Sequence, residues 1–202
     1  MESPRTLHDF GRSLPAPLFA CQYPAPGSPE LAARAVELLA PTKISIDQSW
    51  GLDHGTWAVL AKAWPEANIP VVQLSLDVGL SDREHFDLAH QLLPLRDEGV
   101  LIVGSGNIVH NLGVLRWDDA AAPYDWATRF NTYIKQCIVR NDMEGFFAYP
   151  KCGDDARNSV PSPEHLWPLL YTLGARDGDR VELHTDFVQY KSLSMTSLVF
   201  ST

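Results

Sequence analysis

The stretch VLIVGSGNIVHNL, residues 100–112, joins an apolar run to glycines and then to a histidine. A strand covered on both faces of a sheet is continuously apolar, so residues 100–106 predict a buried strand. Its glycines allow a tight backbone turn at the strand end. Sites in open α/β sheets form at such ends, where loops meet in a crevice. His110 is therefore a structural residue, part of an anion-binding turn, or a metal ligand.

The anion-binding interpretation of this stretch is weak. A dinucleotide-binding fingerprint needs glycine at position 109, where valine stands, and no Walker-type Lys-Ser/Thr pair follows the glycines. Asn107 and Asn111 can fix neighbouring groups by hydrogen bonds. Spacing alone leaves the structural and the metal-binding interpretations of His110 open.

Outward from this stretch, helical and strand patterns alternate. Ser28, Pro29 and Glu30 are typical of a helix start, and they predict a helix over 28–40. Further helices are predicted at 81–95, at 122–139, at 162–175 with a break at Pro168, and after the loop at 50–60. Strands are predicted at 43–47, 70–77, 100–106, 181–188 and 194–200. The pattern predicts the α/β class: a single layered domain over 1–202, with a central mixed sheet flanked by helices.

Composition narrows the partners and the compartment. The formal net charge is −9 and no block of Lys or Arg occurs, which argues against nucleic acid and anionic membranes as partners. The three cysteines form no CxxC pair, as expected for reduced thiols. No apolar stretch approaches the roughly 18 residues of a membrane span, and the first ten residues lack a signal-peptide pattern. We therefore expect a cytoplasmic location.

Three of the seven histidines are candidates for chemistry. His54, in DHGTW, lies on a loop where a carboxylate could hold it for proton transfer; alternatively it only caps the following helix. His165, in SPEHL, fits a helix start as a capping or partly buried residue, and imidazoles with a carboxylate also suit Fe(II) or Zn(II). His54, His110 and His165 lie far apart in sequence, so only the fold could bring them together.

The other histidines are assigned structural positions. His85 and His90 lie five apart on the predicted helix at 81–95 and do not share a face, so we expect both at the surface. His184 is expected on a sheet face. A nucleophilic triad is not supported, because no GxSxG motif occurs.

Eight blocks occur together and in order along nearly the whole chain. They are TLHDFG (6–11), QYPAPGSPELA (22–32), WGLDHGTW (50–57), IPVVQLSLD (69–77), LRDEGVLIVGSGNIVHNL (95–112), YDWATRFN (124–131), PSPEHLWPLLYTLGA (161–175) and SLSMTSLVF (192–200). In this respect the chain resembles the class III extradiol ring-cleavage dioxygenase family, in particular its 4,5-DOPA extradiol dioxygenase-like branch.

The resemblance implies a function and a site. It implies cleavage of a catechol (DOPA-like) ring with O2, a non-haem Fe(II) cofactor with Zn(II) as the alternative, and a small-molecule substrate. By motif, His54 resembles the family's acid/base histidine. His110 and His165 match histidines of the metal-centred site, and the resemblance leaves open which of the two is a direct ligand.

The chain also departs from the family pattern. The HGSP-like and SAHW-like motifs, which supply further metal ligands in the family, do not occur, and the start MESPRTLHDFG resembles an interior segment. A start assigned at an internal methionine, a true truncation, or a different metal arrangement would each explain this. We expect that N-terminal strands are lacking, that a sheet edge and apolar surface are exposed, and that copies of the chain associate.

The same departure sets the expected activity and its alternatives. We expect weak or absent iron binding and little ring cleavage, unless another chain completes the site. The alternative function is a non-catalytic metal-binding or interaction protein on the same scaffold. A zinc hydrolase ranks third, because His and carboxylate ligands also suit activated water.

Overall fold

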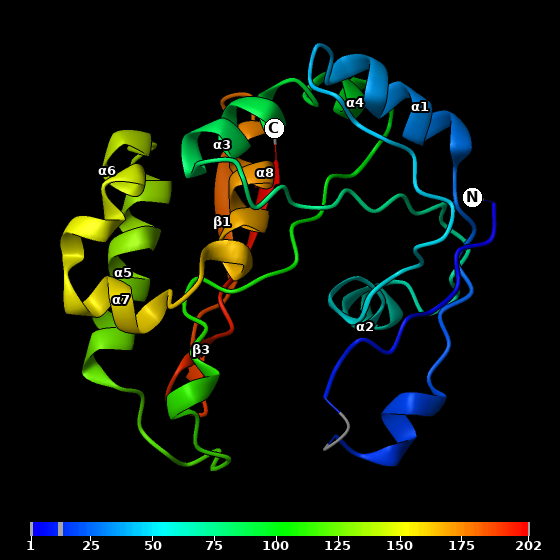
Figure 1. Ribbon diagram of the computed structural model, residues 1–202. Coiled ribbons are helices and arrows are strands. Elements are labelled where there is room, and N and C mark those ends of the chain that lie inside the picture. Colours follow the sequence, from blue (N-terminus) through cyan, green and yellow to red (C-terminus); the bar gives the residue numbers. More distant parts are fainter. Residues whose placement is uncertain (1, 12–13, 202) are drawn as a thin grey trace. The chain divides into compact units, whose positions relative to one another are not determined.

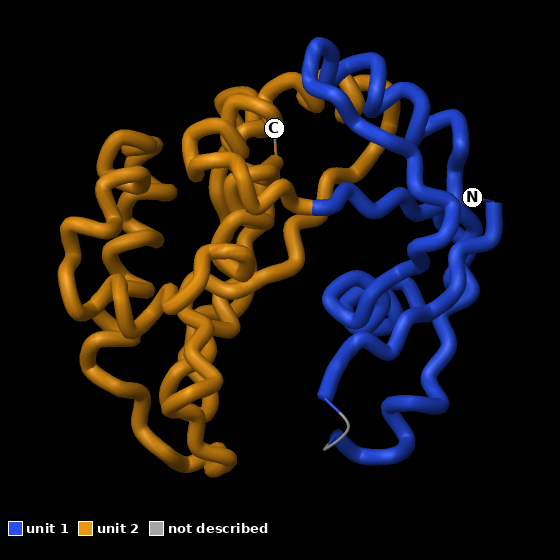
Figure 2. Tube along the Cα trace, viewed as in Figure 1, with its two compact units in different colours: residues 1–75 blue, residues 76–202 orange. Residues whose placement is uncertain are grey.

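The computed structural model describes residues 2–11 and 14–201, and these divide into two compact units (Figures 1 and 2). Unit 1 covers residues 1–75 and unit 2 covers residues 76–202. The mixed α/β class predicted from the sequence is confirmed. Among the described residues, no helix is both long enough and apolar enough to cross a membrane.

Unit 1 has three helical segments: η1 (Ala16–Ala20), α1 (Pro29–Leu38) and α2 (His54–Ala63). The helix predicted from Ser28 is confirmed, because the Ser28 hydroxyl accepts a hydrogen bond from Leu31 N at 3.1 Å. A small core packs beneath α2 and consists of Tyr23, Ala25, Leu52, Trp57, Leu60 and Ala67. Leu7 N donates to Leu52 O at 2.8 Å, so the N-terminal segment is held beside the loop that leads to α2.

Unit 2 contains most of the helices. They are α3 (Asp82–His90), α4 (Pro94–Asp97), η2 (Leu112–Val114), α5 (Asp125–Val139), α6 (Met143–Phe147), η3 (Tyr149–Cys152), α7 (Asp154–Ser159), η4 (Pro163–His165) and α8 (Trp167–Gly174). Ser81 and Glu84 form a reciprocal capping box at the start of α3. The break predicted at Pro168 is confirmed: η4 ends before α8 begins, and Pro168 lies in the first turn of α8, where a missing N–H costs little.

The apolar core of unit 2 lies among α5, α7, α8 and the segment that precedes η2. Its buried members are Ile108, Val109, Ala127, Phe130, Ile134, Cys137, Ile138, Phe146, Tyr149, Ala156, Leu166, Trp167, Leu170 and Leu173. Helices α3 and α8 pack closely because Gly174 lets the backbone of Phe86 approach; a Cβ at Gly174 would lie 2.5 Å from Phe86 O.

The described residues end in four short strands, where the patterns at 181–188 and 194–200 predict two. They are β1 (Arg180–Thr185), β2 (Val188–Gln189), β3 (Leu193–Ser194) and β4 (Ser197–Ser201). β1 pairs antiparallel with β4, and β2 pairs antiparallel with β3. Each pair forms a separate two-stranded sheet.

The central mixed sheet is the part of the prediction that differs. Residues 43–47, 70–77 and 100–106 belong to no strand in the described chain. The prediction that 100–106 is buried is wrong, since Leu101 is 68% exposed and Val103 is 50% exposed. A continuously apolar run requires neighbours on both sides to form a buried strand, and the described residues provide no ladder there.

Gly106 provides a test of the packing between residues 104–110 and η4. A Cβ on Gly106 would lie 2.2 Å from His165 O, so Gly106→Ala should force these segments apart. We expect it to lower the free energy of unfolding by about 1–3 kcal/mol, measured by urea denaturation. Gly113→Ala is the control, because its Cβ would lie 3.3 Å from its nearest neighbour, Asn111 Oδ1. Equal losses in the two variants would contradict the close approach.

Candidate functional site

His110 is fixed by its backbone and by the residues on either side. Its N–H donates to Ser159 O, at the end of α7, at 2.9 Å. His110 also forms an antiparallel bridge with Leu193 of β3. In that bridge Ser194 N donates to Val109 O at 2.9 Å. The position of His110 is thus set by two elements that follow it by 49 or more residues, which spacing arguments do not reach.

The glycines before His110 serve close packing. Gly104 and Gly106 face the carbonyl oxygens of Pro168 and His165, and a Cβ at either glycine would lie within 2.3 Å of the oxygen it faces. Asn107 N donates to His165 O at 2.8 Å. This contact joins the segment before His110 to the η4 turn that carries His165. The glycines were predicted to allow a tight turn at a strand end. In the structure they allow the backbone of η4 and of the start of α8 to approach closely.

The two candidate metal histidines lie against each other in unit 2. The ring centroids of His110 and His165 are 3.5 Å apart, with an angle of 20° between the planes, so the rings are stacked. Burial, together with the neighbouring His165, lowers the pKa of His110 to about 4. His110 is therefore neutral near pH 7, and an imidazole nitrogen is free of a proton for use as a base or ligand.

A carboxylate accompanies the histidine pair. Glu164 Oε1 lies 4.0 Å from His165 Nε2 and accepts a hydrogen bond from Ser162 Oγ at 2.7 Å. Burial raises the pKa of Glu164, but hydrogen bonds from Ser162 and the backbone outweigh it and leave the pKa lowered. Glu164 therefore carries its charge near neutral pH, beside the exposed side of His165.

The donors at this pair fit a metal in kind but not in number. Neutral imidazoles and a carboxylate are donors that suit Fe(II) and Zn(II). In the part of the chain that the structure describes, no three or more His, Cys, Asp or Glu side chains are grouped so that they could hold a metal ion. We therefore derive no reaction step through a metal.

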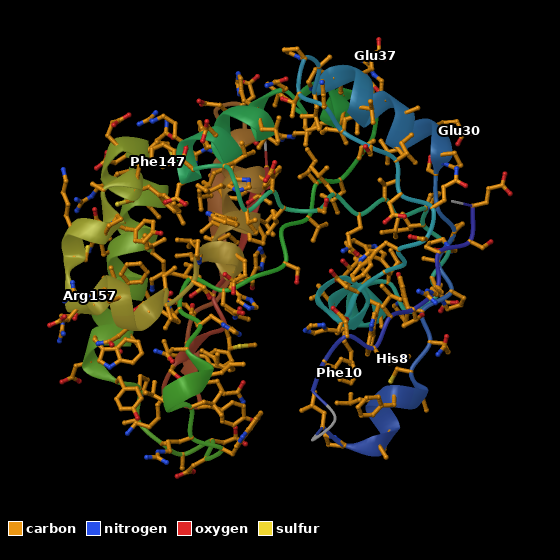
Figure 3. All side chains as sticks on the ribbon, in the orientation of Figure 1. His8, Phe10, Glu30, Glu37, Phe147 and Arg157 are labelled. Carbon is orange, nitrogen blue, oxygen red and sulfur yellow. The ribbon has the colours of Figure 1, made fainter. Side chains whose placement is uncertain are left out.

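His54 lies in unit 1 as the first residue of α2. Its ring Nδ1 is 2.9 Å from Asp9 Oδ1, and its backbone N donates to the same oxygen at 2.9 Å. Burial raises the pKa of Asp9, but the hydrogen bonds from His54 leave it lowered overall. The ionised carboxylate can only accept, so Nδ1 carries the proton and Nε2 is the nitrogen free to act as a base. Phe10 packs edge-on against the ring at 5.6 Å, beside His8 (Figure 3).

The carboxylate that holds His54 is therefore Asp9, and the adjacent Asp53 has another task. Asp53 caps α2 by accepting from Thr56 N at 2.9 Å, and Gln73 Nε2 donates to its other oxygen at 2.6 Å. Spacing gave no signal for Asp9, which lies 45 residues before His54. Asp9 belongs to the block TLHDFG, which occurs together with the block that contains DHGTW. That co-occurrence was the only signal in the sequence that could have pointed to Asp9.

The surface prediction for His85 is wrong. His85 is fully buried, with its ring 4.4 Å from that of Trp167 and its Nδ1 3.1 Å from the Tyr171 hydroxyl. It shares the inner face of α3 with Leu88 and Ala89, and α8 covers that face. His90 is exposed as predicted, and His184 lies on β1.

Comparisons with known proteins show the family to which the chain belongs. The family described as "Catalytic LigB subunit of aromatic ring-opening dioxygenase" matches residues 2–201. The chain is 44% identical to a 4,5-DOPA dioxygenase extradiol of Escherichia coli K12, over 98% of this chain and 74% of that protein. It is 40% identical to a protein of the same name from Beta vulgaris, over 84% of this chain but only 64% of the plant protein.

A solved structure extends the likeness to the fold. The crystal structure of an uncharacterized protein from Escherichia coli K12 superposes with a TM-score of 0.83 at 42% identity, over 98% of this chain and 77% of the other. The chain is an enzyme of the extradiol dioxygenase class. It belongs to the family of the catalytic LigB subunit of aromatic ring-opening dioxygenase, which confirms the resemblance read from the sequence.

The lowered pKa of His110 predicts how stability changes with pH. An unfolded imidazole titrates near 6.5, whereas folded His110 titrates at about 4. The unfolded state therefore binds the proton first, and the stability contributed by neutral His110 is complete above the unfolded pKa and declines as the pH falls toward the folded one. We expect the free energy of unfolding to fall more between pH 7 and pH 4.5 in the wild type than in His110→Gln, measured by urea denaturation. The same pH dependence in both proteins would refute the neutral, buried state of His110.

Proposed function

We propose that this chain is an extradiol dioxygenase that opens the ring of a catechol with O2. The observation that carries the proposal is the stacked His110–His165 pair, with His110 held neutral. Two relatives at 40% identity or more are named 4,5-DOPA dioxygenase extradiol, which favours a DOPA-like catechol.

In this proposal His110 and His165 contribute nitrogen donors to a non-haem metal site, with Fe(II) preferred and Zn(II) as the alternative. A bound metal would supply Lewis acidity toward the catechol hydroxyls. Since the described residues do not group three donors, we expect the isolated chain to hold the metal weakly. Excess free metal should offset weak affinity by mass action.

The proposed role of His54 is proton transfer. Asp9 fixes the Nδ1–H tautomer, which leaves Nε2 able to take a proton from a catechol hydroxyl and return it later. A ring that is about half exposed, with a side-chain exposure of 48%, is accessible to substrate. The assignment itself rests on the likeness of DHGTW to the family motif.

Oxygen uptake with excess Fe(II) tests the function directly. The purified chain, supplied with Fe(II) and L-DOPA or caffeate, should consume O2 and form a yellow semialdehyde. His110→Gln and His165→Gln should each lower the rate at least tenfold. His184→Gln is the matched control, because His184 is an exposed histidine on β1 and should leave the rate unchanged. Equal rates in the wild type and in His110→Gln would contradict the proposal.

The alternative, a non-catalytic metal-binding protein, is favoured by one observation, the lack of a three-donor group in the described residues. It predicts that Fe(II) or Zn(II) binding depends on His110 and His165 while no O2 is consumed. Metal titration followed by oxygen uptake on the same sample separates the two functions.

Asp9 gives a graded test of the proton-transfer role. His54→Ala should lower kcat by about 10²–10⁴-fold, the usual contribution of a general base. Asp9→Ala should lower kcat by a smaller factor, about tenfold, because the base remains but its ring is no longer oriented by the contact with Asp9 Oδ1. Oxygen-uptake kinetics measure both. An unchanged kcat in Asp9→Ala would show that the contact has no part in catalysis.

A further inference from the structure

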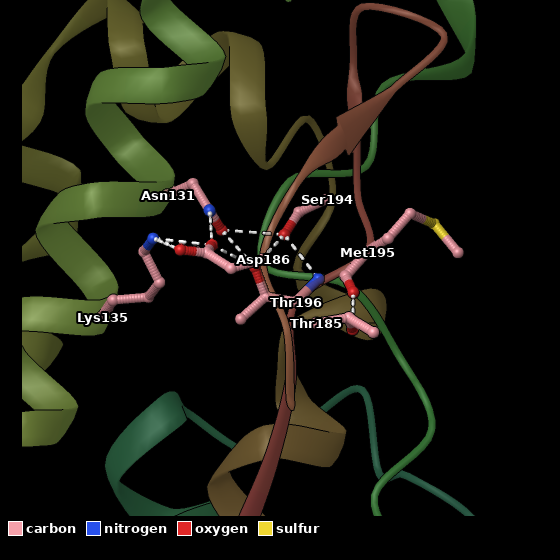
Figure 4. Close-up of polar contacts among 7 residues, drawn as sticks. All are labelled: Asn131, Lys135, Thr185, Asp186, Ser194, Met195 and Thr196. Atoms are coloured by element: carbon pink, nitrogen blue, oxygen red, sulfur yellow. Dashed lines mark hydrogen bonds and ion pairs between the residues drawn. The ribbon is translucent and has the colours of Figure 1, made fainter. Parts of the chain in front are cut away.

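A polar network lies between α5 and the strands at the end of the chain (Figure 4). At its centre Asn131 is 4% exposed and Ser194 is 1% exposed. Ser194 Oγ donates to Asn131 Oδ1 at 2.8 Å, and Thr196 Oγ1 donates to the same oxygen at 3.1 Å. A buried amide on the apolar face of a helix costs free energy unless it is hydrogen-bonded, and an apolar residue would pack there more simply. The Asn131 amide therefore contributes hydrogen bonds to this position, which an apolar side chain could not provide.

The orientation of the Asn131 amide is set by a charge. Asn131 Nδ2 donates to Asp186 Oδ1 at 3.4 Å. Lys135 Nζ, one turn along α5, contacts the two oxygens of Asp186 at 2.6 and 2.5 Å. Since a carboxylate can only accept, the NH2 group of Asn131 must face it, and Oδ1 must face the two hydroxyls. Ser194 thus meets an acceptor held in one direction.

The backbone of Ser194 is hydrogen-bonded to two residues that precede His110, namely Val109 and Asn107. Ser194 N donates to Val109 O at 2.9 Å, and Asn107 Nδ2 donates to Ser194 O at 2.6 Å. Ser194 therefore uses its hydroxyl to reach α5 and its two backbone groups to hold the residues that lead into His110. The blocks YDWATRFN and SLSMTSLVF, which end in or contain these residues, meet at this point.

We propose that Asn131 is a positioning residue for His110, acting through Ser194. The proposal rests on the proposed function, in which the ring of His110 must keep its stacked place against His165. Because an error of about 1 Å in the placement of a reacting group can cost about 100-fold in rate, a fixed amide at Asn131 would act on turnover without touching substrate.

The test compares Asn131→Leu with Thr185→Val. Leucine fills the same space but removes the Asn131 oxygen to which the Ser194 and Thr196 hydroxyls donate. We expect Asn131→Leu to shift the NMR signals of the His110 and His165 ring protons, because their stacking changes, and to lower kcat about tenfold with KM unchanged. Thr185→Val is the control; it removes hydrogen bonds to Met195 O and Ser197 Oγ at the end of the β1–β4 pair but none to residues 107–110.

The NMR signals of the two rings decide whether Asn131 positions His110. Wild-type ring signals in Asn131→Leu, or equal shifts in Asn131→Leu and Thr185→Val, would overturn the proposal. If Asn131→Leu does not fold, Ser194→Ala removes the same hydroxyl with less change in volume and should shift the same signals. The NMR arm needs no turnover, so a chain that opens no catechol would refute the proposed function while the positioning of His110 remained testable.

Discussion

A short antiparallel pairing between the residues around His110 and β3 holds the candidate site of unit 2 together. Ser194 N donates to Val109 O at 2.9 Å, and Asn111 N donates to Ser192 O at 3.1 Å. The N–H of His110 itself, which this pattern leaves free, donates to Ser159 O. These three bonds satisfy the backbone where the chain is buried, and an unpaired polar group there would be costly. They leave the side chain of His110 as the part that is free to face His165.

The segment that carries His165 is held by contacts with α3. Trp167, two residues after His165, donates from Nε1 to Asp82 Oδ1 at 2.7 Å, and its ring packs on that of buried His85. Asn107 N also donates to His165 O, which joins the segment before His110 to η4. His110 and His165 thus stack because separate elements bring their backbones together, and the burial that results keeps His110 neutral. The chemical state of the site follows from packing.

The sequence predicted what local signals encode. The helix at 28–40 and the break at Pro168 follow from capping and from the missing N–H of proline, and the structure has both. The central sheet was not correctly predicted, because strand pairing depends on partners that lie far away in the chain. The continuous apolar run in 100–106 predicted a buried strand. Apolar character alone, however, cannot supply a neighbouring strand to hydrogen-bond with. His85 was misjudged for a related reason, since only the packing of α8 shows which face of α3 is inward.

The candidate site divides in the same way. His54, His110 and His165 were named from motifs, but the stacking of two of them across 55 residues could not be derived from spacing. Asp9 was missed because its contact with His54 spans 45 residues. Asn131 lies in the helix predicted over 122–139, and its burial beside Ser194 appears only in the fold.

Amide hydrogen exchange is the most direct test of the central claim that the pairing with β3 and α7 fixes His110. We predict that the amides of His110, Asn111 and Ser194 exchange slowly and with similar protection, because they open together, while the amides of Leu101 and Val103 exchange orders of magnitude faster. Exchange of His110, Asn111 and Ser194 as fast as that of Leu101 would show that the pairing is not a fixed feature of the fold and would contradict the account.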